Sequence, residues 1–216
     1  MTRHSRLSRD RRAVAAIEFV IILPFMLALL AGVVDLSLAT ITARRLTAAA
    51  ADVATIASTM AVQSSNLNAV TGQQAWQATT APFARFPNWR IGGTGASFSI
   101  TLSSVSFTPS AGGYKASTDW SASNTSGTTV LRPCGTLPAV ADNSASSMSS
   151  LPAGVFGPTS ILVGDVSTQF VPMFSGVFTG PIQMLRSAYV SPRINNGVTL
   201  SAGGPAKQVI CPKRDR

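Results

Sequence analysis

The side chains that most often carry enzyme chemistry are sparse in this chain of 216 residues. Its one histidine, His4, lies near the N-terminus, which excludes a Ser-His-Asp triad, a Cys-His pair and a histidine-bound metal from everything that follows. Lys115 and Lys207 occur in no Ser-x-x-Lys spacing, and the acids beyond residue 43 form no local pair. These acids are Asp52, Asp119, Asp142, Asp165 and Asp215. The sequence therefore predicts no catalytic, cofactor-binding or metal site.

One acid, Glu18, has an unusual position. It interrupts a run from Ala13 to Val34 in which every other residue is apolar or backbone-permissive. A carboxylate inside the edge of a bilayer is costly, so such a residue usually has a partner and marks function. Two interpretations are open. Glu18 pairs with a group on a neighbouring helix, or its side chain extends toward the headgroups without a specific partner.

The apolar run around Glu18 is long enough to cross a membrane. At about 1.5 Å per residue, a helix over this run covers a hydrocarbon core of about 30 Å. A helix buried in a soluble domain would keep a polar face, which this run lacks. A cleaved signal peptide would have a shorter apolar region ending at a small-x-small site, whereas this run meets Asp35 first. The sequence therefore predicts a transmembrane helix over residues 14–42.

Charges on both sides of this helix predict its orientation. The leader, residues 1–13, carries the arginines Arg3, Arg6, Arg9, Arg11 and Arg12. Against the single acid Asp10, such a bias holds an N-terminus in the cytoplasm. Arg44 and Arg45 follow the span and weaken the bias without reversing it. We therefore expect a cytoplasmic basic leader and an extracytoplasmic remainder.

The net charge of +9 and the pI near 11.1 do not predict nucleic-acid binding. Part of the basic charge belongs to the leader, where topology explains it. Most of the other basic residues are scattered singly, rather than forming a stripe interleaved with aromatic residues.

The two cysteines, Cys134 and Cys211, lie in the part expected outside the cytoplasm, where thiols tend to be oxidised. Without partner histidines they are too few for a zinc site. A disulfide between them would close a long loop and stabilise the domain by about 3 to 5 kcal/mol. The sequence therefore predicts that they are bridged.

Beyond the predicted span the helical pattern continues over residues 43–62. Leu46, Val53 and Met60 recur at a heptad spacing in an alanine-rich stretch without Gly or Pro. One amphipathic continuation is therefore expected, giving a single helix from about Ala13 to about Val62. Its apolar seam would pack either on the chain's own outer domain or on neighbouring helices in an assembly.

Residues 63–216 change to an alternating pattern, which predicts a mainly β domain with a small antiparallel sheet. Ala96–Phe107 and Tyr114–Ser123 alternate apolar residues with Ser and Thr around a glycine-containing loop, as a hairpin does. Further expected elements are strands at Ile161–Val171, Ile182–Val190 and Val198–Leu200, a short helix at Val70–Phe83 and a surface loop at Asn143–Pro158. The predicted fold class is α+β, with the outer half of the long helix covering the apolar face of the sheet.

The stretch RRAVAAIEFVIILPFMLALLAGVVDLSLA closely resembles the TadE-like family, small single-pass proteins of the tight-adherence (Flp) pilus secretion system. The family pattern has an Arg-Gly pair, then small residues, Glu-Phe, an aliphatic run with an early proline, and a glycine-containing stretch with an acid. The matching positions are Arg12, Ala15, Ala16, Glu18, Phe19, Pro24, Gly32 and Asp35. The resemblance implies a non-enzymatic pseudopilin or minor pilin in a bacterial inner membrane. The contrasting class is a signal-anchored envelope enzyme or binding protein.

The resemblance also implies roles for particular residues. In similar proteins a prepilin peptidase cuts so that the glutamate becomes the fifth residue, which here places the cut between Ala13 and Val14. The freed amine would pair with Glu18 of a neighbouring helix, with Phe19 beside it in the assembly motif. Cleaved members have Gly before the cut where this chain has Ala13, so an uncleaved anchor is also open. The implied partners are the membrane, other pilins, pilus assembly proteins and the peptidase.

Overall fold

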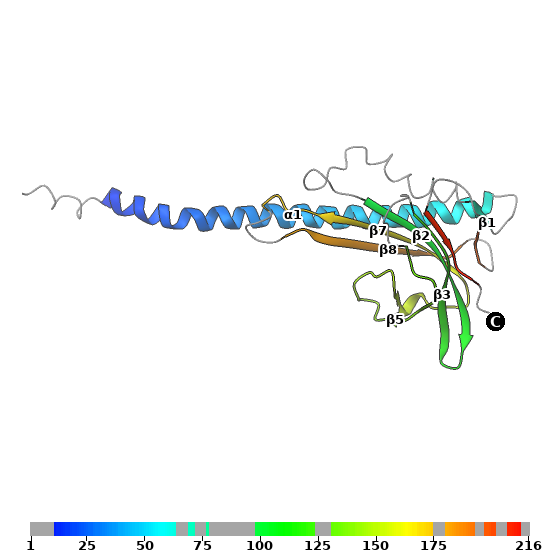
Figure 1. The fold of residues 1–216 in the computed structure, drawn as a ribbon. Helices are drawn as coiled ribbons and strands as arrows, with labels where there is room; N and C mark the ends of the chain where they lie inside the picture. The colour runs from blue at the N-terminus through cyan, green and yellow to red at the C-terminus, as the bar shows by residue number, and fades with distance from the viewer. Residues whose placement is uncertain are drawn as a thin grey trace, which may run out of the picture.

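The computed structural model of the protein describes residues 11–63, 69–71, 77, 98–123, 131–174, 180–192, 197–201 and 207–212. In this part of the chain, one long helix is followed by a curled antiparallel sheet (Figure 1). The elements are α1 (Arg11–Gln63), β1 (Ala69–Thr71), β2 (Phe98–Ser110), β3 (Gly113–Ser123), β4 (Thr136–Leu137), β5 (Ala139–Val140), β6 (Leu151–Pro152), the 3-10 helix η2 (Ala153–Val155), β7 (Ile161–Phe170), β8 (Ile182–Val190), β9 (Thr199–Ser201) and β10 (Lys207–Ile210). The predicted α+β fold class is confirmed.

Helix α1 runs without a break through the predicted span and its predicted continuation. Pro24 lies inside it. Several hydroxyl side chains along α1 donate hydrogen bonds to carbonyl oxygens one turn back, as Thr42 does to Leu38 at 2.7 Å. These hydroxyls are therefore satisfied within the helix and do not require water.

The main sheet has the strand order β10-β3-β2-β7-β8, with β4 also paired to β3. Its centre is the predicted hairpin, in which β2 and β3 pair from Thr101 with Ser123 to Ser110 with Gly113. Gly113 takes φ +134°, a left-handed conformation that favours glycine at the end of the tight turn. The predicted hairpin is confirmed, and β2 extends three residues beyond its predicted end at Phe107. A bulge between Ser104 and Val105 shifts the register along β2.

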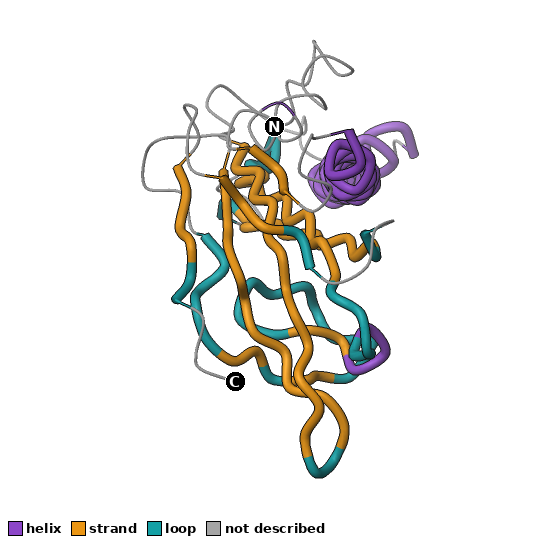
Figure 2. The backbone as a smooth tube through the Cα atoms, turned by 90° about the vertical axis from the view of Figure 1, so that its right-hand side faces the viewer, coloured by secondary structure: helices purple, strands orange, loops and turns teal. Residues whose placement is uncertain are grey.

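The outer half of α1 covers one face of this sheet, where it packs on β7 and β8. Figure 2 looks nearly along the helix and shows it on one side of the strands, with the β2–β3 hairpin projecting away. The seam residues Leu46 and Val53 are completely buried. They share a core cluster with Ile100, Leu102, Trp120, Ala122, Leu162, Val166 and Phe170. At Leu46 and Val53 the seam therefore packs on the chain's own domain, which is one of the two arrangements expected from the sequence.

Helix and sheet come into close contact at Gly164 of β7. A Cβ atom at this position would lie 2.6 Å from the backbone carbonyl oxygen of Ala50 and 3.4 Å from Cβ of Ala54. Both alanines are completely buried. Small residues on the two elements thus allow their backbones to approach.

We expect Gly164→Ala to lower the free energy of unfolding by about 1 to 3 kcal/mol, because the added methyl meets backbone that cannot move without shifting α1 from the sheet. Urea unfolding of the detergent-solubilised full chain, followed by tryptophan fluorescence, measures the change. Gly157→Ala is the matched control, since a Cβ there meets no atom within 4 Å. Equal stability of the two variants would contradict the prediction.

The opposite face of the sheet carries a second core, formed by Val105, Ala116, Leu137, Leu151, Ile161 and Val163. The segment from residue 131 to 156 covers it. The expectation of a surface loop at Asn143–Pro158 was therefore wrong in part, because this range contains β6 and η2 and Leu151 is completely buried. The local composition is polar, yet Leu137 and Leu151, together with the partly buried Val155 and Phe156, pack the segment onto the sheet.

The remaining predictions on this domain have mixed outcomes. The strands expected at Ile161–Val171 and Ile182–Val190 are β7 and β8. The strand expected at Val198–Leu200 is β9, shifted by one residue. The helix expected from Val70 is wrong at its start, where β1 instead pairs parallel with β9. Most of that range lies outside the described residues.

Candidate functional site

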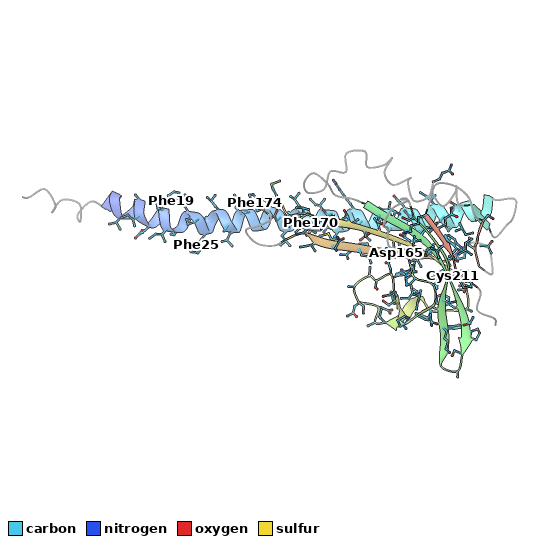
Figure 3. All side chains as sticks on the ribbon, in the orientation of Figure 1. Phe19, Phe25, Asp165, Phe170, Phe174 and Cys211 are labelled. Carbon is cyan, nitrogen blue, oxygen red and sulfur yellow. A yellow bond between two sulfur atoms is a disulfide. The ribbon has the colours of Figure 1, made fainter. Side chains whose placement is uncertain are left out.

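The N-terminal half of α1 is an apolar rod without a covering element in the described structure. Figure 3 shows Phe19 and Phe25 on the part of the helix that extends beyond the β domain. Phe19 is 63% exposed and Phe25 is 69% exposed. Among the described residues, α1 is the one helix long and apolar enough to cross a membrane, and its most apolar stretch is not buried at all. An exposed apolar surface of this size requires lipid or other helices around it.

The residues expected to act in assembly lie at the beginning of this rod. Val14, Glu18 and Phe19 are all exposed. Val14 and Glu18 are one helical turn apart and therefore lie on the same side of α1. No described residue forms an ion pair with Glu18 within the chain. Ala13 belongs to the helix, but its side chain lies outside the described part.

Asp35 connects the far end of the rod to the sheet. Its Oδ1 accepts a hydrogen bond from the backbone N–H of Met173 at 2.8 Å, and its Oδ2 accepts one from Phe174 at 3.3 Å. These two residues form the turn that follows β7, and Figure 3 places Phe174 beside α1. One carboxylate thus satisfies two backbone donors that the turn leaves without a ladder partner.

Residues 13–55 of the chain match the family model described as TadE-like protein. The chain carries a TadE-like segment. This segment contains the apolar rod with Glu18 and Asp35, and it continues into the half of α1 that packs on the sheet. A search of curated proteins and a search of solved structures found no match to the chain.

Beyond the TadE-like segment, the β domain contains a buried ion pair between Arg132 and Asp165. Both side chains are completely buried, and Nη2 of Arg132 lies 2.9 Å from each carboxylate oxygen of Asp165. Ser187 on β8 donates a hydrogen bond to the same carboxylate. The guanidinium also donates to the carbonyl oxygens of Ser147 and Ser150, each at 3.3 Å. The pair therefore attaches the covering segment to β7 and β8.

Burial raises the pKa of the Asp165 carboxyl above its ordinary value, while the charge of Arg132 and the hydrogen bonds from Ser187 and Arg132 act in the opposite direction. Every polar partner around the carboxylate thus offsets a desolvation penalty. This arrangement is typical of a structural ion pair, since both side chains are completely buried. Sequence reasoning did not find it, although an acid inside the apolar strand Ile161–Phe170 was a signal that a cationic partner exists.

The predicted disulfide is present. Cys134 and Cys211 are bonded, with their Cα atoms 5.5 Å apart. Cys134 precedes β4 and Cys211 follows β10, and both of these short strands pair with the same strand, β3. The disulfide therefore links the ends of β4 and β10, two short strands that are far apart in the sequence and pair with the same strand.

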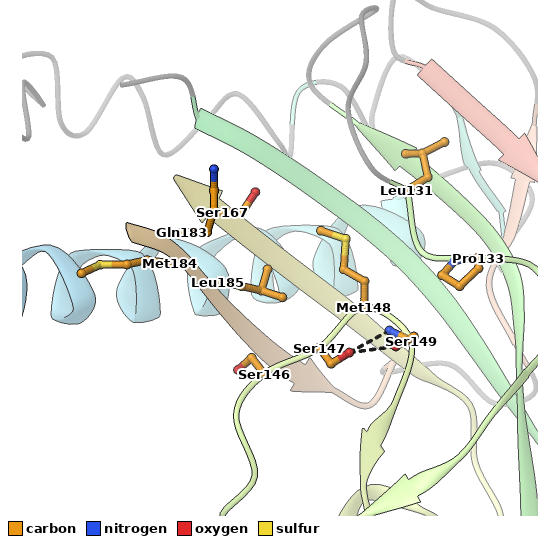
Figure 4. Close-up of a pocket in the computed structure, with 10 residues that line it drawn as sticks. All are labelled: Leu131, Pro133, Ser146, Ser147, Met148, Ser149, Ser167, Gln183, Met184 and Leu185. Atoms are coloured by element: carbon orange, nitrogen blue, oxygen red, sulfur yellow. Dashed lines mark hydrogen bonds between the residues drawn. The ribbon is translucent and has the colours of Figure 1, made fainter. Parts of the chain in front are cut away.

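One groove of the domain has a volume of about 530 Å³ and lies beside β8 (Figure 4). Its lining is Leu131, Pro133, Ser146, Ser147, Met148, Ser149, Ser167, Gln183, Met184 and Leu185. These residues include no acid, base or cysteine, so the serines have no neighbour in the groove that could activate them. Within the described ranges, no group of three His, Cys, Asp or Glu side chains is arranged to hold a metal ion. The candidate site is therefore the TadE-like segment itself.

Proposed function

We propose that this chain is a non-enzymatic, membrane-anchored pseudopilin or minor pilin that contributes to a tight-adherence (Flp) pilus or its secretion system. The observation that carries the proposal is the TadE-like match over residues 13–55. It falls on a helix whose apolar half is exposed and whose other half is fixed to the chain's own β domain. Such a helix can be shared with an assembly while the β domain remains outside it.

The proposed organisation follows the burial along α1. Residues 1–13 form the cytoplasmic leader, 14–42 the span, 43–62 the link and 63–216 the periplasmic domain, with the span in the bacterial inner membrane. Thr42 is the first buried residue along the described part of α1, which supports a boundary at this point. The arginine bias of the leader supports the orientation.

The proposed role of Glu18 is to pair with a positive group on another helix of the assembly. Its exposure on the apolar rod leaves it open to such a partner, and the cost of an unpaired carboxylate inside a bilayer favours one. If the chain is processed between Ala13 and Val14, the new amine is the proposed partner. Other pilins, pilus assembly proteins and the prepilin peptidase are the proposed interacting proteins.

We expect Glu18→Gln to abolish piliation while leaving the amount of protein in the membrane fraction unchanged, because removing a charge eases insertion but removes the pairing group. The measurement compares membrane abundance with surface pili in cells that carry each variant. Glu18→Asp is the matched control, since it keeps the charge and should retain part of the assembly. Normal piliation with Glu18→Gln would remove the pairing role, and loss from the membrane would assign Glu18 to folding.

Processing is measured on the same cells by the mass of the membrane protein. Ala13→Gly supplies the residue that cleaved relatives have before the cut, so this variant should increase the fraction of shortened chain if the peptidase acts here. An unchanged mass in both the parent and the variant would assign the chain to an uncleaved anchor.

A further inference from the structure

Three exposed apolar side chains gather at the end of the sheet that lies closest to the apolar rod. Met173 is 68% exposed and Phe174 is 39% exposed, both in the turn after β7. Ile182 is 43% exposed at the start of β8, where it pairs with Phe170. The turn thus presents apolar surface instead of the polar side chains that are usual in an exposed turn.

The hydrogen bonds from Met173 and Phe174 to Asp35 fix the position of this turn along α1. At about 1.5 Å per residue, the helix rises about 30 Å from Val14 to Asp35, which matches the thickness of a hydrocarbon core. A helix that enters the hydrocarbon core at Val14 therefore leaves it near Asp35, and the remaining residues of the proposed span, up to 42, lie at the level of the headgroups. The turn bonded to Asp35 is thus at the opposite membrane surface.

We propose that the turn at Met173 and Phe174 is a second membrane contact, which inserts its side chains into the bilayer surface beside the point where α1 leaves the lipid. This inference rests on the proposed span of α1. The occupant of the apolar patch is lipid, because the patch is continuous with the apolar surface of the rod and lies at the level of the membrane surface. Transfer of the side chains from water to lipid supplies the driving force.

Asp35 makes this insertion feasible. A backbone N–H that enters a bilayer without an acceptor costs several kcal/mol. The Asp35 carboxylate accepts from the N–H groups of Met173 and Phe174, so these two donors are satisfied before the side chains reach lipid. Asp35 is therefore a positioning residue, and together with α1 it gives the β domain two points of attachment, which fix its tilt relative to the membrane.

The test places a single fluorophore on the full chain in phosphatidylcholine vesicles, by labelling Phe174→Cys under conditions that keep the Cys134–Cys211 bridge intact. Lipids that carry a nitroxide near the headgroup should quench the probe, and its emission should shift to the blue. Tyr114→Cys is the matched control, because Tyr114 is 38% exposed but lies at the hairpin turn away from α1. The control probe should show neither effect.

A third probe at Leu27→Cys, within the span, separates the two proposals, because it should be quenched by nitroxides placed deep in the acyl chains. Quenching at Leu27 with none at Phe174 would overturn the membrane contact and leave the span intact. Absence of quenching at both would overturn the contact together with the span. A disulfide-linked dimer through position 174 without quenching would show that a second copy covers the turn, which also overturns the contact.

The positioning role of Asp35 is tested by combining Phe174→Cys with Asp35→Ala. Loss of quenching at position 174, with quenching at Leu27 retained, is the result expected if Asp35 positions the turn. Unchanged quenching at position 174 would overturn the role of Asp35.

Discussion

Asp165→Ala is expected to lower the free energy of unfolding of the full chain by about 3 to 5 kcal/mol, because it leaves the guanidinium of Arg132 buried without its counter-charge. The two carbonyl oxygens that remain near Arg132 carry only partial charges and cannot replace a carboxylate. Urea unfolding in detergent, followed by the fluorescence of buried Trp120, measures the loss.

Two variants sharpen this experiment. Asp142→Ala also removes a carboxylate, which accepts a hydrogen bond from the N–H of Gly154 at 2.7 Å, but this side chain is exposed and its loss should cost clearly less. The double variant Arg132→Met with Asp165→Leu removes both charges and should recover most of the stability. If Asp165→Ala lowers the free energy of unfolding no more than Asp142→Ala does, the buried ion pair contributes no more to stability than an exposed hydrogen bond.

Helix α1 could be predicted because its signal is long and uniform. Its apolar run and heptad seam extend over many residues, so local errors shift only its ends. The position of strand β7 was also predicted, because residues 161–171 have a strand-like composition. The close contact at Gly164 was not, because it depends on which two backbones the fold brings together.

Strands β4 and β10 could not be predicted because they have no pattern of their own. β4 has two residues and β10 has four, and each exists because β3 offers backbone groups to pair with. The ion pair was hidden for a related reason. Asp165 signals a buried charge, but Arg132 lies in a stretch without periodicity and reaches it only through the folded topology.

In the candidate site, Glu18 and Asp35 could be predicted from the sequence to different degrees. Glu18 is recognisable because one acid in an apolar helix is uncommon, and the TadE-like match covers it. Asp35 was recognised as the acid that follows the apolar run and as part of the family pattern, without a partner. Its contact with the turn after β7 depends on a segment far along the chain, which no local pattern connects to α1.

The disulfide could be predicted because the chain has two cysteines and therefore one pairing. Replacing both Cys134 and Cys211 by serine should lower the free energy of unfolding by about 3 to 5 kcal/mol, since the bridge closes a loop with a sequence separation of 77. The effect should be concentrated at β10. Its pairing with β3 ends where the N–H of Cys211 donates to the carbonyl oxygen of Asp119 at 2.8 Å, and without the bridge this short strand is free to separate.

Hydrogen exchange distinguishes this local effect from a general one. In the serine variant the amides of β10 should exchange faster, while those of β7, which is paired on both sides with β2 and β8, keep more of their protection. Reduction of the parent chain should reproduce the result, and the serine variant should not respond to reductant. The unfolding midpoint of the parent chain could also be the same with and without reductant. This result would show that β4 and β10 stay paired with β3 without the disulfide.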